Sequence, residues 1–193
     1  MQAIDVLLNR RSAKTLIDPA PDEGALGLLL ECAARAPDHG RLRPWRFIVI
    51  RGAARERLGE LMAGQLLRKL PAATAETLQR ERQKALRAPL IIVVAAVCNP
   101  EARIPAIEQI LAAGAAAQNM MLAATALGFG AMWKTGDAAY DGAVKAALGL
   151  AAEDAIVGFL YLGTVPADSP PPPARTSWQD RVSYWSGEPG LKA

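Results

Sequence analysis

The fold is decided by one stretch, residues 105–127, which reads PAIEQILAAGAAAQNMMLAATAL. Its pattern predicts a single long helix. Small side chains that would let neighbouring backbones approach closely stand at Ala112, Ala113, Ala115, Ala116 and Ala117. We therefore expect this helix to be the spine of the fold. The stretch is about as long as a membrane span, but Gly114, Gln118 and Asn119 interrupt it, so we interpret it as a buried helix of a soluble protein.

Downstream of this helix the sequence alternates between strand and turn signals. Gly128 is a good residue to end the helix, and residues 129–133 follow as a predicted strand. After a turn at 134–137, residues 141–150 predict a short helix. Residues 156–162 (IVGFLYL) then predict a buried strand.

Upstream, the run LIIVVAAV at residues 90–97 is continuously apolar, which is typical of a central strand buried on both faces. Residues 45–50 (WRFIVI) predict a second strand. Between these strands lie two charged, amphipathic stretches, residues 53–69 and 74–86, which predict peripheral helices with a solvated face.

The first part of the chain predicts two more helices. The apolar spacing of residues 3–9 indicates a short helix that delivers the cluster Arg10-Arg11-Ser12. Asp22 is a plausible N-cap of the second helix, which Pro37 stops, and a loop follows at 36–44. Taken alone, these patterns indicate an α+β or α/β fold with four or five strands.

The composition is that of an ordinary folded domain. The chain has 193 residues, of which 51% are hydrophobic and 21% charged, so it has neither the low hydrophobicity nor the high charge of a disordered chain. One domain spanning residues 1–193 is expected. The net charge of +3 is mild, and no block of Lys or Arg tracks a nucleic-acid backbone, so a few localised anion contacts explain it better.

The cysteines and the chain ends suggest a reducing compartment. Cys32 and Cys98 lie in apolar runs without metal-ligand spacing, so we expect reduced, buried thiols, no metal site and a cytoplasmic location. No secretory signal opens the sequence. Residues 166–193 predict a proline-stiffened arm, in which Trp178, Tyr184 and Trp185 are expected to pack on another surface.

Three motifs, in the right order and spacing, resemble the nitroreductase family: residues 9–14 (NRRSAK), residues 36–39 (APDH) leading to 44–47 (PWRF), and residues 127–136 (LGFGAMWKTG). Together with the ending VGFLYLG, they look most like the small YdjA-type NAD(P)H nitroreductases. The resemblance covers the chain to about Trp185. It implies an α+β fold with a central, mostly antiparallel sheet wrapped by helices. It also implies an intertwined homodimer in which both subunits build each FMN site.

The first motif has the chemistry of a phosphate and ribityl clamp. Arg10 can fork two donors onto a phosphate and Ser12 can donate a third bond, with Arg11 beside them. Two exposed arginines that follow a helix could equally serve its C-terminal dipole, and the resemblance favours the clamp. The resemblance also places Lys14 near the pyrimidine end of the flavin, where a cation stabilises the reduced form, although a surface lysine is the simpler interpretation.

The second motif contains the sequence's one histidine, His39. From the residues alone it could be a general base, a metal ligand or a loop side chain. By resemblance, Arg35 and His39 come from the partner subunit and reach the FMN bound by the other chain. Most family members have serines and an asparagine in this loop, whereas this chain has Asp38, His39 and Arg41.

The third motif contains Trp133, Lys134 and Thr135. By resemblance, backbone groups at this place contact the flavin ring. Trp133 could otherwise be an ordinary core aromatic. Farther along, Arg175 and Arg181 could add phosphate contacts, as the tail does in some longer family members.

The implied function is that of an FMN-dependent NAD(P)H oxidoreductase. NADPH or NADH would pass a hydride to N5 of FMN, and a nitroaromatic or quinone-like acceptor would follow in a ping-pong sequence without an obligatory acid or base side chain. Other flavin chemistry on the same fold is an alternative. A non-catalytic flavin-binding or redox-sensing dimer is a second alternative, and a basic RNA-binding module is the least favoured one.

Overall fold

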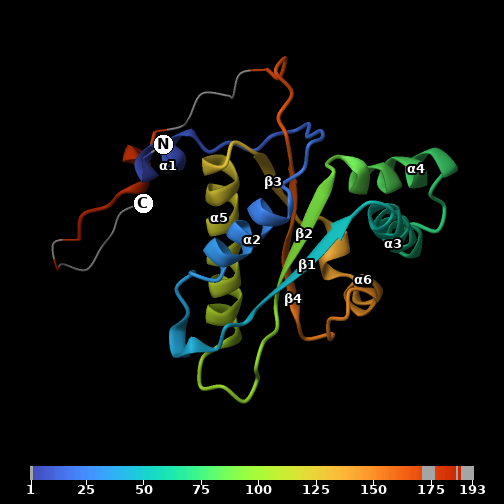
Figure 1. Cartoon of the computed structure of the whole chain (residues 1–193). Coiled ribbons are helices and arrows are strands. Elements are labelled where there is room, and N and C mark those ends of the chain that lie inside the picture. Colours follow the sequence, from blue (N-terminus) through green and yellow to red (C-terminus); the bar gives the residue numbers. More distant parts are fainter. Residues whose placement is uncertain (1, 171–176, 186, 188–193) are drawn as a thin grey trace.

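A computed structural model of the chain describes residues 2–170, 177–185 and 187 (Figure 1). These residues form one four-stranded antiparallel sheet in the order β1-β2-β4-β3. Its strands are β1 (Trp45–Arg51), β2 (Leu90–Ala96), β3 (Gly130–Lys134) and β4 (Ala155–Gly163). All seven residues of β2 are buried, which confirms the central strand expected from its continuous apolar run. The α+β fold with a mostly antiparallel sheet is also confirmed.

Helices cover both faces of this sheet. One face packs against α2 (Glu23–Ala33) and α5 (Ala106–Ala126), and Leu90, Ile92 and Val94 point toward it. The side chains of Ile91 and Val93 point toward the opposite face. It is covered by α3 (Ala54–Lys69) and α6 (Gly142–Ala147), with α4 (Ala75–Gln83) beyond α3. The strict alternation along β2 divides its side chains between two cores.

The long helix α5 is the spine that its sequence predicts. Its described residues include five fully or nearly fully buried alanines, Ala112, Ala113, Ala116, Ala117 and Ala124. The helix contacts α2, all of the strands and the short N-terminal helix α1 (Ala3–Asn9). Gly128, with φ +84°, turns the chain out of the helix as expected. None of the described helices is both long enough and apolar enough to cross a membrane.

The expectation of buried cysteines is wrong. Cys32 is exposed and Cys98 is only partly buried. The buried stripe of α2 runs through Leu26, Leu29 and Ala33, and Cys32 lies off this stripe. An apolar run in a helix therefore does not show which of its residues face the core.

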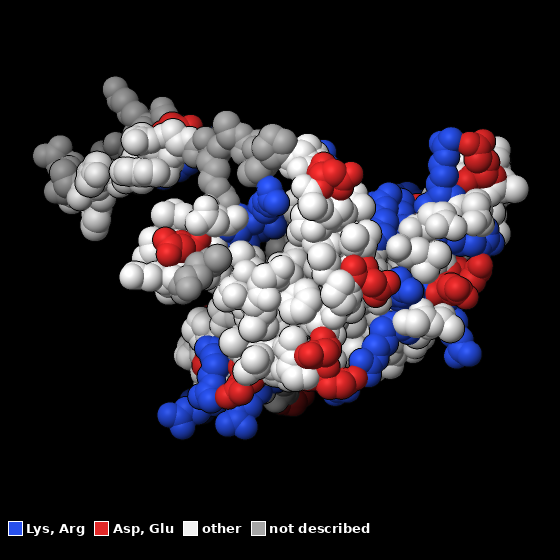
Figure 2. Space-filling view, turned by 45° about the horizontal axis from the view of Figure 1, so that its top comes forward, with Lys and Arg blue, Asp and Glu red and all other residues white. Residues whose placement is uncertain are grey.

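An exposed apolar surface remains on the α5 side of the molecule. Ile107 and Leu111 on α5 are 60% and 63% exposed, and Ile4 and Leu8 on α1 are exposed as well. Charged side chains crowd the α3–α4 side, whereas the middle of the view in Figure 2 is mostly uncharged. The aromatic residues of the arm are also exposed in the single chain, and nothing within it tests the packing expected of them.

A glycine on β4 permits close contact with the indole of Trp133. A Cβ added at Gly158 would lie 2.1 Å from Nε1 of Trp133. We expect Gly158→Ala to lower the free energy of unfolding by about 1–3 kcal/mol, because the overpacked indole must shift. The urea midpoint measures this change. The control is Gly27→Ala in α2, where an added Cβ meets nothing within 4 Å and stability should stay level or rise. Equal midpoints for wild type and Gly158→Ala would show that the indole moves at no cost.

Candidate functional site

The first motif lies at the outer edge of β3. The backbone N–H of Ala13 donates to the carbonyl of Ala131 at 3.0 Å, and Ser12 forms a parallel bridge with Ala131. A segment more than a hundred residues earlier in the chain is thereby held beside β3, and Arg10 and Arg11 follow directly from α1. The predicted clamp residues Arg10, Arg11 and Ser12 are therefore together at one sheet edge, where Ser12 and Arg11 are exposed and Arg10 is partly buried.

The same edge offers backbone groups farther along β3. Because the carbonyl of Ala131 faces away from β4, the alternation of strand backbone groups also turns the N–H and carbonyl of Trp133 outward. The indole of Trp133 points to the α5 face instead, where Nε1 donates to the carbonyl of Val157 at 3.0 Å. The side chain of Trp133 is thus a core aromatic, and only its backbone faces the open edge. Thr135 follows β3 as an exposed residue.

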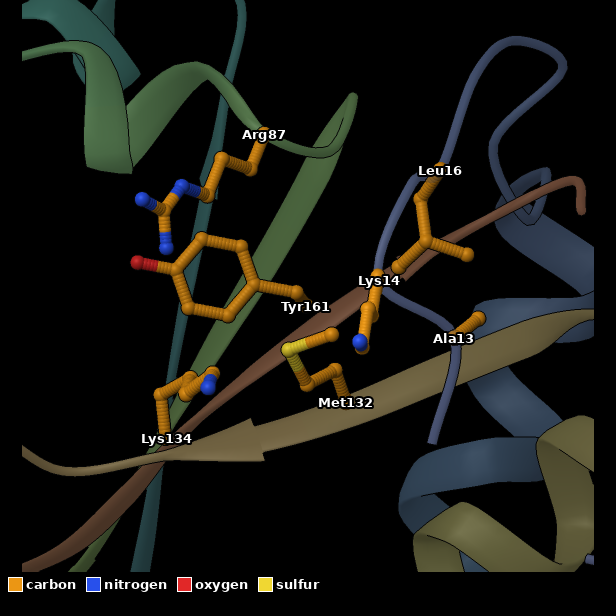
Figure 3. A pocket seen from close by; sticks show the side chains of 7 residues that line it. All are labelled: Ala13, Lys14, Leu16, Arg87, Met132, Lys134 and Tyr161. Atoms are coloured by element: carbon orange, nitrogen blue, oxygen red, sulfur yellow. The ribbon is translucent and has the colours of Figure 1, made fainter. Parts of the chain in front are cut away.

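Side chains from four segments surround a hollow on the other face of the sheet. Lys14, Lys134 and Arg87 lie around an apolar floor formed by Met132 and Tyr161 (Figure 3). Ala13 and Leu16 complete the lining. The hollow is shallow and opens to solvent. None of the described residues that line it carries a carboxylate, so its three cations favour a negatively charged ligand.

Tyr161 remains neutral in this hollow. Burial raises the pKa of its hydroxyl to about 12, while the positive charge of Arg87 partly opposes the shift and Glu81 adds to it. The phenol therefore brings no negative charge to the three cations at any pH near neutrality.

Arg35 and His39 lie elsewhere in the chain. His39 Nδ1 lies 2.7 Å from Glu108 Oε2, in the first turn of α5. Arg35 follows α2 and pairs with Glu31 at 3.3 Å. Arg10 and Ser12 lie beyond the opposite end of α5, and a helix rising 1.5 Å per residue sets Glu108 and Ala126 about 27 Å apart along its axis. Within one chain, His39 is therefore far from the predicted clamp.

The sequence analysis missed three residues of interest: Arg87, Tyr161 and Glu108. The sequence pattern places Tyr161 in a buried strand and Glu108 in a helix, and it gives neither residue a functional role. Arg87 stands just before the central strand, and this position is the one feature of the sequence that could have indicated it. Of the two arginines proposed in the arm, Arg175 lies outside the described residues, and Arg181 is exposed and pairs with Asp180 at 3.4 Å.

Comparisons with known proteins agree on one family. A family model described as "Nitroreductase family" matches residues 7–164. The Escherichia coli protein named "Putative NAD(P)H nitroreductase YdjA" is 40% identical over 164 residues, covering 85% of this chain and 88% of that protein. A Haemophilus influenzae protein named "Putative NAD(P)H nitroreductase" is 35% identical over 85% of this chain and 89% of its own length.

Solved structures give the same result. A nitroreductase-like family protein from Bacillus cereus has a TM-score of 0.81 with 28% identity, and the match covers 97% of each chain. A Desulfovibrio desulfuricans protein titled a putative nitroreductase in complex with FMN has a TM-score of 0.73 with 27% identity. That match covers 96% of this chain and 97% of the other.

The raised pKa of Tyr161 has a measurable consequence. In the unfolded chain the phenol ionises near its ordinary pKa of 10, and in the folded chain near 12. The contribution of the neutral phenol to stability is therefore fully present below pH 10, and about 3 kcal/mol of it is lost as the pH rises from 10 to 12. The tyrosinate absorbance of wild type minus that of Tyr161→Phe should titrate with a midpoint near 12. A midpoint near 10 would mean that solvent reaches the hydroxyl.

Proposed function

The chain belongs to the nitroreductase family, and from this premise we propose that it is an FMN-dependent NAD(P)H oxidoreductase that reduces nitroaromatic or quinone-like acceptors. The observation that carries the proposal is the hollow beside β3, which the described residues line with three cations and without a carboxylate. We place it in one domain, residues 1–193, with NADPH or NADH as the electron donor.

The residues at the β3 edge suit two parts of FMN, its phosphate and its flavin ring. A terminal monophosphate suits a short clamp of two arginines and a serine, namely Arg10, Arg11 and Ser12. The outward backbone at Trp133 and the neighbouring Lys134 and Thr135 suit the polar edge of a flavin ring. A dinucleotide cofactor would call for a further phosphate site, and the clamp is too short to supply one.

When bound, FMN would supply the redox chemistry, namely hydride transfer from NAD(P)H at N5 and reduction of the acceptor. The chain's own residues bind and orient. With FMN bound so that its pyrimidine end faces the hollow, Lys14, Lys134 and Arg87 would place positive charge near the group that becomes negative on reduction, which would make that reduction easier. Because the hollow is open to solvent, donor and acceptor can use one site in turn, as a ping-pong sequence requires.

We propose that the protein is a homodimer with shared sites. The exposed apolar residues Ile107 and Leu111 on α5 form a surface suited to a second copy. A twofold axis that sets two α5 helices antiparallel would bring the start of one helix to the end of the other. His39 and Arg35 of one chain would then approach the Arg10 clamp of the other, although they lie far from the clamp in their own chain.

The absorbance spectrum tests the proposed activity. We expect purified protein to be yellow, to release FMN on denaturation, to bleach with NADPH or NADH, and to regain colour when a nitroaromatic is added. Release of FAD, or colourless protein after incubation with FMN, would contradict the proposal. Bleaching without turnover of any acceptor would point to a redox sensor instead.

A mixed-dimer experiment tests the shared site. We expect Arg10→Ala to weaken FMN binding by about 1.5–3 kcal/mol, the contribution of a charge-assisted hydrogen bond, whereas Arg57→Ala on α3 serves as an exposed control. In heterodimers with Arg10→Ala on one chain and Arg35→Ala plus His39→Ala on the other, one site collects every defect and about half of the flavin sites survive. Equal loss at both sites, or a monomer that retains FMN, would refute the assignment.

A further inference from the structure

The loop that carries His39 is held in an unusual conformation. Gly40 has φ +75°, and the non-glycine residues Arg41 and Arg43 have φ of +56° and +50°. Residues other than glycine rarely adopt a positive φ, and they keep it only where the surrounding structure holds the backbone there. Asp38 contributes by accepting the backbone N–H of Arg43 at 2.6 Å, and Gly40 faces Ile104, just before α5. The loop therefore presents His39 in a defined place.

The contact between His39 and Glu108 defines the ring itself. An ionised carboxylate only accepts hydrogen bonds, and Glu108 lies in the first turn of α5, beside the His39 ring. At 2.7 Å from the carboxylate, Nδ1 therefore carries the proton and donates it to Oε2. Nε2 is left for another partner, and no described residue is recorded as bonding to it.

Fold stability does not account for this pair. The side chains of His39 and Glu108 are 66% and 42% exposed, and ion pairs this open to water contribute little to stability. An orienting role is the better explanation, since a hydrogen-bonded second partner commonly fixes the tautomer and direction of a functional imidazole.

We propose that Glu108 is a positioning residue for His39. It fixes the ring so that Nε2 reaches across the dimer interface to the FMN held by the partner subunit. This inference rests on the proposed function for its ligand, but the state of the ring can be measured without FMN. Glu108 acts through His39 and touches no cofactor itself.

The first test reads the tautomer directly. His39 is the single histidine of the chain, so its two ring nitrogens can be assigned in a long-range proton–nitrogen NMR spectrum without ambiguity. At a pH where the ring is neutral, we expect the Nδ1–H form in wild type and a shift toward Nε2–H in Glu108→Ala. The same tautomer in both proteins would overturn the inference, whether or not the protein binds FMN.

The second test is a double-mutant cycle on the dissociation constant of FMN. We expect Glu108→Ala to weaken FMN binding about tenfold in wild type and to have no further effect in His39→Ala, because the two residues act as one unit. Glu108→Gln should recover part of the loss, since its amide oxygen can still accept from Nδ1–H. The matched control is Glu23→Ala. It removes a glutamate in the first turn of α2 that pairs with Arg51 of β1, and it should leave FMN binding unchanged.

The outcomes distinguish the positioning role of Glu108 from the proposed FMN-dependent function. Equal losses from Glu108→Ala in both backgrounds would overturn the positioning role, as would unchanged binding in the single variant. Absence of FMN binding by wild type would refute the proposed function, and the NMR result would then still decide whether Glu108 orients His39. Urea midpoints of all variants, expected to match wild type, exclude a general loss of structure as the cause.

Discussion

The close approach that alanines allow around α5 is the constraint on which the other features of the structure depend. Five buried alanines let one helix lie against α2 and against the sheet at the same time. Larger side chains there would push α2 and the sheet apart. The helix also sets the distance between two candidate site segments, the His39 loop at its start and the β3 edge beyond its end. One element thus determines both the packing and the spacing of these segments.

The arrangement of the candidate site follows from the alternation of side chains along β3. Along β3, alternate residues send side chains to opposite faces, so Met132 and Lys134 line the hollow while Trp133 enters the α5 core. The backbone alternates in the plane of the sheet, which leaves Trp133 with polar groups on the open edge. One pentapeptide strand therefore supplies an apolar floor, a cation and a hydrogen-bonding edge without any irregularity in its backbone.

Much of this arrangement could be predicted from the sequence, for physical reasons that are local. Apolar periodicity located every strand and the long helix within a residue or two, since burial imposes that periodicity. The sequence could single out the Arg10 cluster and Trp133 as candidates because their motifs are contiguous, and their roles stay predictions. It could not single out Arg87 and Glu108, because they reach the hollow or the His39 loop through tertiary contacts, and nothing next to them in sequence indicates those contacts. Cys32 was misplaced because an apolar segment does not specify which residue turns to solvent.

The open edge of β3 has a consequence for the protein before it is loaded with cofactor. An unpaired strand edge is a template on which another chain can add a strand, and proteins limit this risk by keeping such edges short or charged. Here β3 has five residues, is partly covered at Ala131 by the N-terminal segment, and ends in Lys134. A ligand or partner lying along the remaining edge would close it. Occupancy of the site would then protect the chain against self-association, in addition to providing its chemistry.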